Sequence, residues 1–460
     1  MNALPPTPPL PAPLQTLLWI RRPIDLMQWC RRRYGSTFVI KLPPFTLVMF
    51  CDPEPIRTIF AAKGDEMHAG GVNRVLRVIV GPNSVLLLDG PEHMRQRKLL
   101  LPSFHGERMR HYGATMAEIT RRSIAGWPEN KPFALHPHTQ DITLQIILRT
   151  VFGAEEGAQL TELSDAMKEM LSIAEYRVAL PLILYLSEHP ELEKRAPWKW
   201  GLRRRDRTDE ILYRQIAARR AEPERGRQDV LAMMLQARDE AGEGMTDAEL
   251  RDELMTAIAA GHETTATSLA WAFERLLLHP EAYARLCAEV RGASGPNGAD
   301  DVGADAEKLA ALPYLDAVIK EVLRLRPVVP LVGRVLQKPC RLGGYDLPAG
   351  TAVAANIFLA QRNPDVYPEP EAFRPERWLG VQPDPASWLP FGGGIRRCIG
   401  AAFATYEMKI VLATILMHCD LELAQKPARI VRRAITFWPE GGTRVRVRHR
   451  VATREAGVAA

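Results

Sequence analysis

The pattern of apolar and polar positions predicts a mainly helical protein. From about residue 53 onward, apolar residues recur at helical spacing, and proline and glycine interrupt them at intervals. Alternating β-branched and aromatic residues predict a hairpin over 37–42 and 46–50, and later strands over 351–357 and 443–448. The chain shows no internal repeat and no convincing linker. We therefore expect one mostly α domain with a smaller β-rich portion.

The N-terminal segment has a different composition. Six prolines stand within residues 5–13, and proline is unfavourable in helix interiors, so residues 1–22 are expected to be an extended or disordered Pro-rich segment before a domain over 23–460. The apolar run 14–20 is much shorter than the about 20 residues that span a bilayer, and no basic region precedes it. We expect no membrane anchor and a cytoplasmic location. The six cysteines, which show no Cys-x-x-Cys pair, agree with a reducing compartment.

One predicted helix is unusually long. Thr246 and Glu249 have the spacing of a capping box, and no proline follows until Pro280, which allows about 32 residues and roughly 48 Å of helix. Its apolar middle contains a polar cluster over 261–265. A glycine inside a helix costs about 1 kcal/mol, and buried polar groups need partners. Bonds from hydroxyls to carbonyls one turn earlier account for the two threonines but leave Glu263 unexplained.

A glycine-rich loop carries the most specific signal for chemistry. Between Phe391 and Gly400, four glycines and two arginines surround Cys398, and an apolar helical run over 401–417 follows. Cys398 should lie at or just before a helix N-terminus, where free N–H groups and the macrodipole favour the thiolate. A thiolate suits a soft or borderline metal. The alternative is that Cys398 is a small buried apolar residue.

The pattern Phe-x-x-Gly-x-Arg-x-Cys-x-Gly over this loop resembles the haem-binding signature of the cytochrome P-450 family. The resemblance implies the cytochrome P-450 fold, with haem b between a long distal helix and a proximal cysteine loop. It implies that Cys398 is the axial thiolate ligand of the iron. The matching positions implied to contact the cofactor are Phe391, Gly394, Arg396 and Gly400.

The cluster over 260–265 resembles the family's helix across the distal haem face. The resemblance implies that Gly261 leaves room for dioxygen and that Glu263 and Thr264 form the catalytic pair that relays protons for O–O cleavage. Peroxide-using relatives lack this acid–alcohol pair. Its presence favours a monooxygenase that depends on O₂.

Two further regions match the family. Haem carries two propionates, which require basic partners. The segment 89–98 resembles the helix beside the haem, which implies that His93 and Arg97, spaced i,i+4, face one propionate. Arg334 and Arg396 would serve the propionates by their positions.

A second set of residues implies a structural role. Glu321 and Arg324 lie one helical turn apart within a helix predicted over 313–326, and Arg377 follows about 50 residues later. Together they resemble the family's Glu-x-x-Arg pair with its completing arginine, a buried network that supports the haem-binding core. Trp378 stands where the family often has phenylalanine.

The expected substrate pocket is apolar, which indicates a lipophilic substrate such as a fatty acid or terpenoid. Its predicted segments are 68–88, 174–200, 258–265, 328–332 and 436–439. No flavin or iron–sulfur module is fused to the chain, so electrons should come from a separate ferredoxin or flavodoxin-type donor. We hypothesise a basic docking face for an acidic donor, formed by the cations that neighbour the predicted haem motifs: Arg95, Lys98, Arg396, Arg397 and Lys409.

The net charge of +6 does not point to nucleic acid. The arginine runs at 203–207 and 219–220 lie in a helical, Glu-containing context typical of a solvated helix face, and no nucleic-acid-binding signature accompanies them. Two alternatives to the monooxygenase remain open: a haem-thiolate isomerase or dehydratase that needs no external electrons, and a non-catalytic haem sensor. The Glu263–Thr264 pair argues against the first, and turnover with a reductase would exclude the second.

Overall fold

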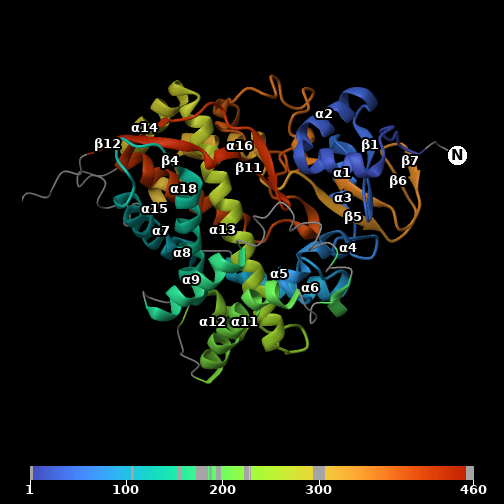
Figure 1. Cartoon of the computed structure of the whole chain (residues 1–460), viewed down its shortest axis with the longest axis horizontal. Helices are drawn as coiled ribbons and strands as arrows, with labels where there is room; N and C mark the ends of the chain where they lie inside the picture. The colour runs from blue at the N-terminus through green and yellow to red at the C-terminus, as the bar shows by residue number, and fades with distance from the viewer. Residues whose placement is uncertain are drawn as a thin grey trace, which may run out of the picture.

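The long helix α13 (Asp247–Leu277) runs through the centre of the molecule, as the computed structural model shows (Figure 1). Its N-terminus has the predicted capping box, in which the Glu249 N–H donates to the Thr246 hydroxyl at 3.2 Å and the Thr246 N–H donates to the Glu249 carboxylate at 2.7 Å. The helix has 31 residues and ends before Pro280. The prediction of one long capped helix is confirmed.

The structure describes residues 4–104, 108–153, 157–171, 185, 189–192, 198–221, 227, 229–293 and 306–451. None of the helices in these ranges combines the length and apolar character needed to cross a bilayer. The other helices are α1 (Ala12–Arg21), α2 (Pro23–Tyr34), α3 (Pro53–Ala61), α4 (Gly70–Asn73), α5 (Arg77–Val80), α6 (Gly90–Leu100), α7 (Arg108–Ala125), α8 (Leu135–Phe152), α9 (Ala158–Leu171), α11 (Trp198–Ala221), α12 (Val230–Gln236), α14 (Pro280–Ala293), α15 (Ala306–Ala310), α16 (Pro313–Leu325), α17 (Ile357–Ala360) and α18 (Ala401–His418).

The strands form small sheets beside the helical body. A five-stranded sheet has the order β1 (Thr37–Leu42), β2 (Phe45–Phe50), β8 (Ala352–Ala355), β5 (Val332–Leu336) and β3 (Met67–His68). A three-stranded sheet joins β4 (Phe133–Ala134), β12 (Arg444–Arg450) and β9 (Cys419–Leu423), and two-stranded pairs join β6 (Cys340–Leu342) to β7 (Tyr345–Leu347) and β10 (Ile430–Arg433) to β11 (Thr436–Pro439). In Figure 1 the five-stranded sheet and the N-terminal helices lie to one side of α13, and α7, α8 and α18 lie to the other.

The predicted strands are found with one difference. β1 and β2 pair antiparallel with Val39 opposite Val48, as expected for the hairpin, and β12 covers the C-terminal strand prediction. The strand expected over 351–357 ends at Ala355, because the Asn356 side chain accepts a hydrogen bond from the Leu359 N–H and so caps the short helix α17. A capping side chain at this position favours a helix over continued strand.

The expectation that residues 1–22 are extended or disordered is wrong for residues 12–21, which form α1. The last proline, Pro13, stands in the first turn, where a missing N–H costs no helical hydrogen bond. Gln15 is fully buried and ties the helix to the sheet: its side-chain oxygen accepts from the Lys41 N–H at 2.8 Å, and its amide donates to the Leu10 carbonyl. Trp19 is buried beside it.

A buried carboxylate connects the helical core to the loop that precedes α18. Glu321 of α16 accepts two hydrogen bonds from the Arg324 guanidinium, at 2.8 and 2.9 Å, and one from Arg377 at 3.0 Å. The Arg374 N–H and the Trp378 indole N–H, both at 2.9 Å, complete its shell. The predicted network is confirmed, and the indole at Trp378 contributes a donor that phenylalanine would lack.

Arg324, the ion-pair partner of Glu321, also has several hydrogen-bond acceptors. It is fully buried, and besides Glu321 it donates to the carbonyls of Gln361, Pro370 and Ala372. Burial alone would raise the pKa of Glu321, but the bonds and the charge of Arg324 outweigh burial and lower it. The stability that this carboxylate contributes is therefore complete above its unfolded pKa and is lost as the pH falls through the lower folded value.

Replacing Glu321 with alanine should strongly destabilise the fold, because it leaves the Arg324 guanidinium buried without a counter-ion. We expect a loss of about 3–5 kcal/mol in the free energy of unfolding. The matched control is Glu369→Ala, which removes the partner of the exposed Arg374 side chain and should cost less than about 1 kcal/mol. Urea unfolding followed by circular dichroism measures both, and equal losses in the two variants would contradict the role assigned to Glu321.

Candidate active site

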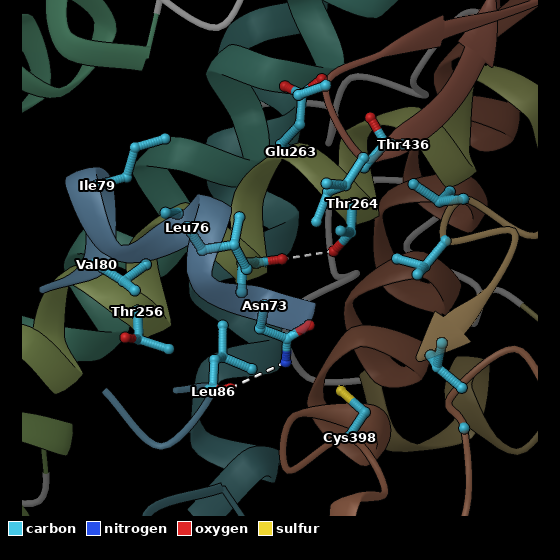
Figure 2. A pocket seen from close by; sticks show the side chains of 18 of the residues that line it. Asn73, Leu76, Ile79, Val80, Leu86, Thr256, Glu263, Thr264, Cys398 and Thr436 are labelled. Carbon is cyan, nitrogen blue, oxygen red and sulfur yellow. Dashed lines mark hydrogen bonds between the residues drawn. The ribbon is translucent and has the colours of Figure 1, made fainter. Parts of the chain in front are cut away.

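A cavity of about 1180 Å³ lies at the centre of the described chain, and it is lined mainly by apolar side chains. Its walls come from α1, α4 to α6, α8, α13 and the loops before β5 and α18, with the β10–β11 turn closing one end. Figure 2 shows Cys398 at one side of this opening and Thr264 and Glu263 of α13 at another. Segments that the sequence separates by more than 100 residues therefore share one cavity.

The glycines of the cysteine loop allow it to pack closely on α3. Gly394 has φ +63°, and a Cβ there would lie 1.7 Å from the Phe60 carbonyl oxygen, while a Cβ at Gly393 would lie 2.4 Å from the Phe60 ring. No side chain larger than hydrogen fits at either position. The loop closes where the Cys398 N–H donates to the Phe391 carbonyl at 2.9 Å, three residues before α18 begins.

Cys398 differs from the other cysteines of the chain in its surroundings. Four of the other five are buried and Cys340 is half-buried, whereas the Cys398 side chain is exposed to the cavity. Removal from bulk water raises the pKa of Cys398. A bond from the Gly400 backbone and the charges of Arg97 and Arg397 lower it only in part. A metal cation bound at the sulfur would stabilise the thiolate form of Cys398.

Aromatic rings link the cysteine loop to the Glu321 network. The ring of Phe391 packs edge-on against Trp388 at 5.9 Å, and Trp388 packs against Trp378 at 6.3 Å. The Trp378 indole in turn donates to Glu321. The position of Phe391, which also lines the cavity, is thus fixed by a buried ion pair on α16.

Four basic side chains predicted to face propionates meet at one part of the cavity. His93 and Arg97 reach it from α6, Arg334 from β5 and Arg396 from the cysteine loop. His93 is 1% exposed and its Nδ1 has no partner among the described residues. Arg396 is the exception in this group, because its guanidinium also pairs with Asp89 at 2.5 Å and donates to two carbonyls of the same segment.

This cluster carries more positive charge than the protein neutralises. Burial and the charges of Arg396, Arg97 and Arg334 lower the pKa of His93 to about 3, and burial with the charge of Arg396 lowers the pKa of Arg334 to about 10. Asp89 is the one acid that opposes this effect on Arg334. Crowded cations and an unpartnered ring nitrogen fit a ligand that brings carboxylates. The residues present therefore fit haem with its two propionates.

Glu263 and Thr264 of α13 both line the cavity, but they have different hydrogen-bond partners. The Thr264 hydroxyl donates to the Ala260 carbonyl at 2.6 Å and Thr265 donates to the Gly261 carbonyl at 2.9 Å, which is the local bonding expected for helical threonines. Thr264 lines the cavity (Figure 2). A Cβ at Gly261 would meet the Ile147 side chain at 3.4 Å, so this glycine also serves the close packing of α13 against α8.

Glu263 points into a polar group that the sequence did not reveal. The Gln140 amide donates to its carboxylate at 2.5 Å, and His136 and Arg433 lie 3.8 Å from it. Burial, followed by repulsion from Arg433 and His262, lowers the pKa of His136 to about 3, so this imidazole is neutral at pH 7. Partners from α8 and β10 account for the acid in the apolar middle of α13, and no sequence motif marks them.

Most cations of the predicted basic docking face have acidic partners in the structure. Arg95 pairs with Asp239 and Glu249, Lys98 with Glu240, Arg396 with Asp89 and Lys409 with Asp316, at distances of 2.5 to 2.7 Å. Arg397 is exposed, and it forms no ion pair with the described residues. Acids distant in sequence neutralise four of the five cations. Of the five, only Arg397 remains an exposed cation without an ion pair to the described residues.

The pocket prediction is largely confirmed, with additions. Residues of the predicted segments 68–88, 258–265 and 328–332 line the cavity, whereas of 436–439 only Thr436 does. Most of the predicted segment 174–200 and of the Gly-rich loop 292–305 lies outside the described residues. Sequence reasoning missed the contributions of α1, the β1–β2 turn and α8. The apolar faces of these elements are visible in the sequence. However, an apolar face that lines a cavity has the same sequence pattern as one that packs in a core.

Replacing Gly394 with alanine should distort the cysteine loop, because the added Cβ would overlap the Phe60 carbonyl. We expect the haem-free protein to lose at least about 2 kcal/mol of stability and the loaded protein to lose its thiolate signal in the carbon monoxide difference spectrum. Gly400→Ala is the matched control in the same loop, since nothing lies within 4 Å of its Cβ and its φ is −84°. Equal stability of the two haem-free variants would show that Phe60 does not constrain the loop.

Comparison with known proteins agrees with this geometry. The family model for cytochrome P450 matches residues 5–443. "Putative cytochrome P450 135B1" of Mycobacterium tuberculosis is 40% identical over 455 residues, which covers 98% of this chain and 92% of that protein. "Putative cytochrome P450 135A1" of the same species is 36% identical over 452 residues and covers 97% of this chain and 95% of its own length.

Solved structures show the same architecture. The structure titled "Retinoic acid bound cyanobacterial CYP120A1" is similar with a TM-score of 0.81 and 25% identity, over 97% of this chain and 99% of the other. The cytochrome P450DA haem domain has a TM-score of 0.82 at 24% identity over 98% of each chain, which shows likeness of fold. This chain therefore belongs to the cytochrome P450 family, the haem-thiolate monooxygenases.

Proposed function

We propose that this cytochrome P450 monooxygenase inserts one oxygen atom of O₂ into a lipophilic substrate and receives its electrons from a separate ferredoxin or flavodoxin-type donor. The observation that carries the proposal is that Cys398, the basic cluster and Thr264 open into one cavity whose remaining lining is mainly apolar. Members of this family hold haem b through an axial cysteine. The residue proposed for that role here is Cys398.

The proposed haem contacts follow from the chemistry of the side chains. The Cys398 thiolate would bind the iron, and its raised pKa in the haem-free protein is of the kind that a metal cation reverses. His93, Arg97 and Arg334 would bind the propionates, with Arg396 shared between a propionate and Asp89. When bound, the haem supplies oxygen activation, and a thiolate ligand favours O–O cleavage.

Glu263 and Thr264 are proposed to deliver protons to the cavity. The Thr264 hydroxyl lines the cavity and keeps a lone pair to accept a proton while it donates to the Ala260 carbonyl. Glu263 is held by Gln140, His136 and Arg433, away from Thr264, and no hydrogen bond between the two is seen. Transfer between them therefore requires a bridging water or a turn of the Glu263 side chain.

The apolar lining supports a fatty acid, a terpenoid or a compound of similar character as substrate. Leu76, Ile79, Val80 and Leu86 line the cavity opposite α13, and aliphatic lining with few polar groups is typical of sites for such molecules (Figure 2). The related structure solved with retinoic acid is named for a ligand of the same kind. Both observations favour a lipophilic substrate without fixing its identity.

The Thr264→Ala variant tests the oxygen insertion and its proton supply together. A substrate found by its spin-state shift of the haem-loaded protein should be oxygenated with ferredoxin and reductase. Thr264→Ala should consume reductant while the yield of product per reductant falls by about tenfold or more, because the cavity loses its proton carrier. Thr264→Ser, which keeps the hydroxyl, should retain coupling. Full coupling in Thr264→Ala would contradict the relay, and no turnover of any bound compound would contradict the monooxygenase reaction on lipophilic substrates.

Reversing the charge of Arg397 should slow electron transfer from an acidic donor. We expect Arg397→Glu to lower the rate of haem reduction at low ionic strength by about tenfold and the difference to shrink as salt is added. Lys98→Glu is the comparison, since Lys98 is already paired with Glu240. Stopped-flow reduction measures both. Unchanged kinetics in Arg397→Glu would rule out a docking site at this residue.

A further inference from the structure

The cavity contains three lysine or arginine side chains away from the cysteine loop and from the basic cluster of His93, Arg97, Arg334 and Arg396. Among the described residues these are Lys168, Arg432 and Arg433. Lys168 pairs with Asp141 at 2.6 Å, and Arg433 lies 3.8 Å from Glu263. For Arg432, neither a hydrogen bond nor an ion pair is present within the described chain. It is the cation of this region that the protein leaves without an acid.

The position of Arg432 follows from strand geometry. Arg432 and Arg433 are consecutive residues of β10, so their side chains leave opposite faces of the strand. Arg433 packs over the Trp438 ring and reaches toward α13, while the Arg432 guanidinium lies 5.3 Å from the centre of the Trp19 ring of α1. β10 contacts α1 and β11 contacts α13, so the hairpin spans the space between these helices (Figure 1).

Arg432 is half-buried at the cavity wall, and no acid lies beside it among the described residues. Burial alone accounts for a pKa lowered to about 10, with no acid to raise it. The acids that line the cavity are committed elsewhere: Asp141 to Lys168, Glu263 to its polar group, and Glu253 to the Val85 N–H, with a pKa raised well above its usual value by burial. A desolvated guanidinium without a counter-ion is unfavourable unless a ligand supplies one.

Arg432 does not belong to the basic cluster that fits the propionates. Arg334 and His93 interact electrostatically with the other members of the basic cluster, and Arg432 is not among the charges that shift either of them. Arg432 thus forms a second positive site, electrostatically separate from the one that fits the propionates. A second anion should bind here.

We propose that Arg432 binds the carboxylate of the substrate, so that the enzyme acts on amphipathic carboxylic acids whose apolar body extends along the cavity. The inference rests on the proposed function, because it assigns one end of the lipophilic substrate. The cavity lining also includes Thr16, Trp19, Leu42, Phe45 and Ile435, of which Trp19 lies against the Arg432 guanidinium. These side chains offer apolar contact to the body of the substrate and leave its charge to Arg432.

A carboxylate fits this site better than a phosphate. A guanidinium binds a carboxylate through two parallel hydrogen bonds and neutralises its single charge. A phosphate monoester carries about two charges at pH 7 and would leave one of them unpaired among apolar side chains. One arginine with no second cation beside it therefore points to a monoanion.

The test compares acids with their methyl esters on the haem-loaded protein. Spin-state titrations with lauric, palmitic and abietic acids and the corresponding methyl esters give dissociation constants for wild type, Arg432→Gln and Arg429→Gln. Arg429 is an exposed arginine near the start of the same hairpin that does not line the cavity, so its variant is the matched control. Wild type and Arg429→Gln should bind the best acid about tenfold or more tighter than its ester.

Arg432→Gln should remove this preference by weakening the acid about tenfold or more, while the affinity for the ester changes less than about twofold. The Trp19 contact offers a competing structural explanation, in which Arg432 only holds α1 in place. That explanation predicts equal weakening of acid and ester together with a lower melting temperature, and such a result would overturn the inference.

The remaining outcomes separate the inference from the proposed function. If wild type binds the esters as tightly as the acids, the carboxylate site is wrong and the lipophilic substrate class stands. If no apolar compound, charged or neutral, shifts the spin state of a protein whose carbon monoxide spectrum shows thiolate ligation, both are wrong. An arginine-dependent preference for acids supports both.

Discussion

The buried carboxylate of Glu321 is the interaction on which the site depends most. It accepts hydrogen bonds from two arginines, a backbone N–H and an indole. Burying an ion pair is costly, and it is retained where every partner is satisfied. Through Trp378, Trp388 and Phe391 the network reaches the loop that presents Cys398. The geometry of the proposed iron ligand is thus set by an ion pair on a different helix.

Cations at the surface and cations in the cavity differ in how far acids of the protein neutralise them. Acids pair with several surface cations, as Glu240 does with Lys98, but among the described residues too few acids lie beside the basic cluster, and none beside Arg432, to balance these internal cations. Unpaired charge costs far more in the interior than at the surface. Retained internal cations therefore indicate where anionic groups of ligands belong. The basic cluster fits two propionates, and Arg432 fits one further carboxylate.

Helix α13 is a buried core helix that also carries polar side chains in its middle. Its length and apolar faces make it the centre of the core, while Glu263 and Thr264 place polar groups in its middle. The Thr264 hydroxyl finds its hydrogen-bond acceptor within the helix. The Glu263 carboxylate instead depends on Gln140, His136 and Arg433 from other elements. The helix tolerates the acid only because α8 and β10 provide these partners.

The sequence by itself determined the local features of this protein. The capping box and the absence of proline defined α13, alternation defined β1 and β2, and the cysteine loop with its glycines identified the cofactor. Each of these depends on residues close together in the chain, where spacing alone fixes geometry. The helix α1 was missed because its stability comes from Gln15 and Trp19 packing on the sheet rather than from propensity.

Only the tertiary structure decided which charges are paired. Lys98, Arg396 and Lys409 looked alike in sequence, and acids from distant segments neutralise each of them. Arg432, which no motif marks, lines the cavity, and no acid of the described residues lies beside it. Electrostatic energies depend on distance and burial, and neither can be read from sequence spacing once the partners are far apart along the chain. The fold class and the proposed iron ligand follow from local pattern, whereas the electrostatics of the cavity follow from the fold.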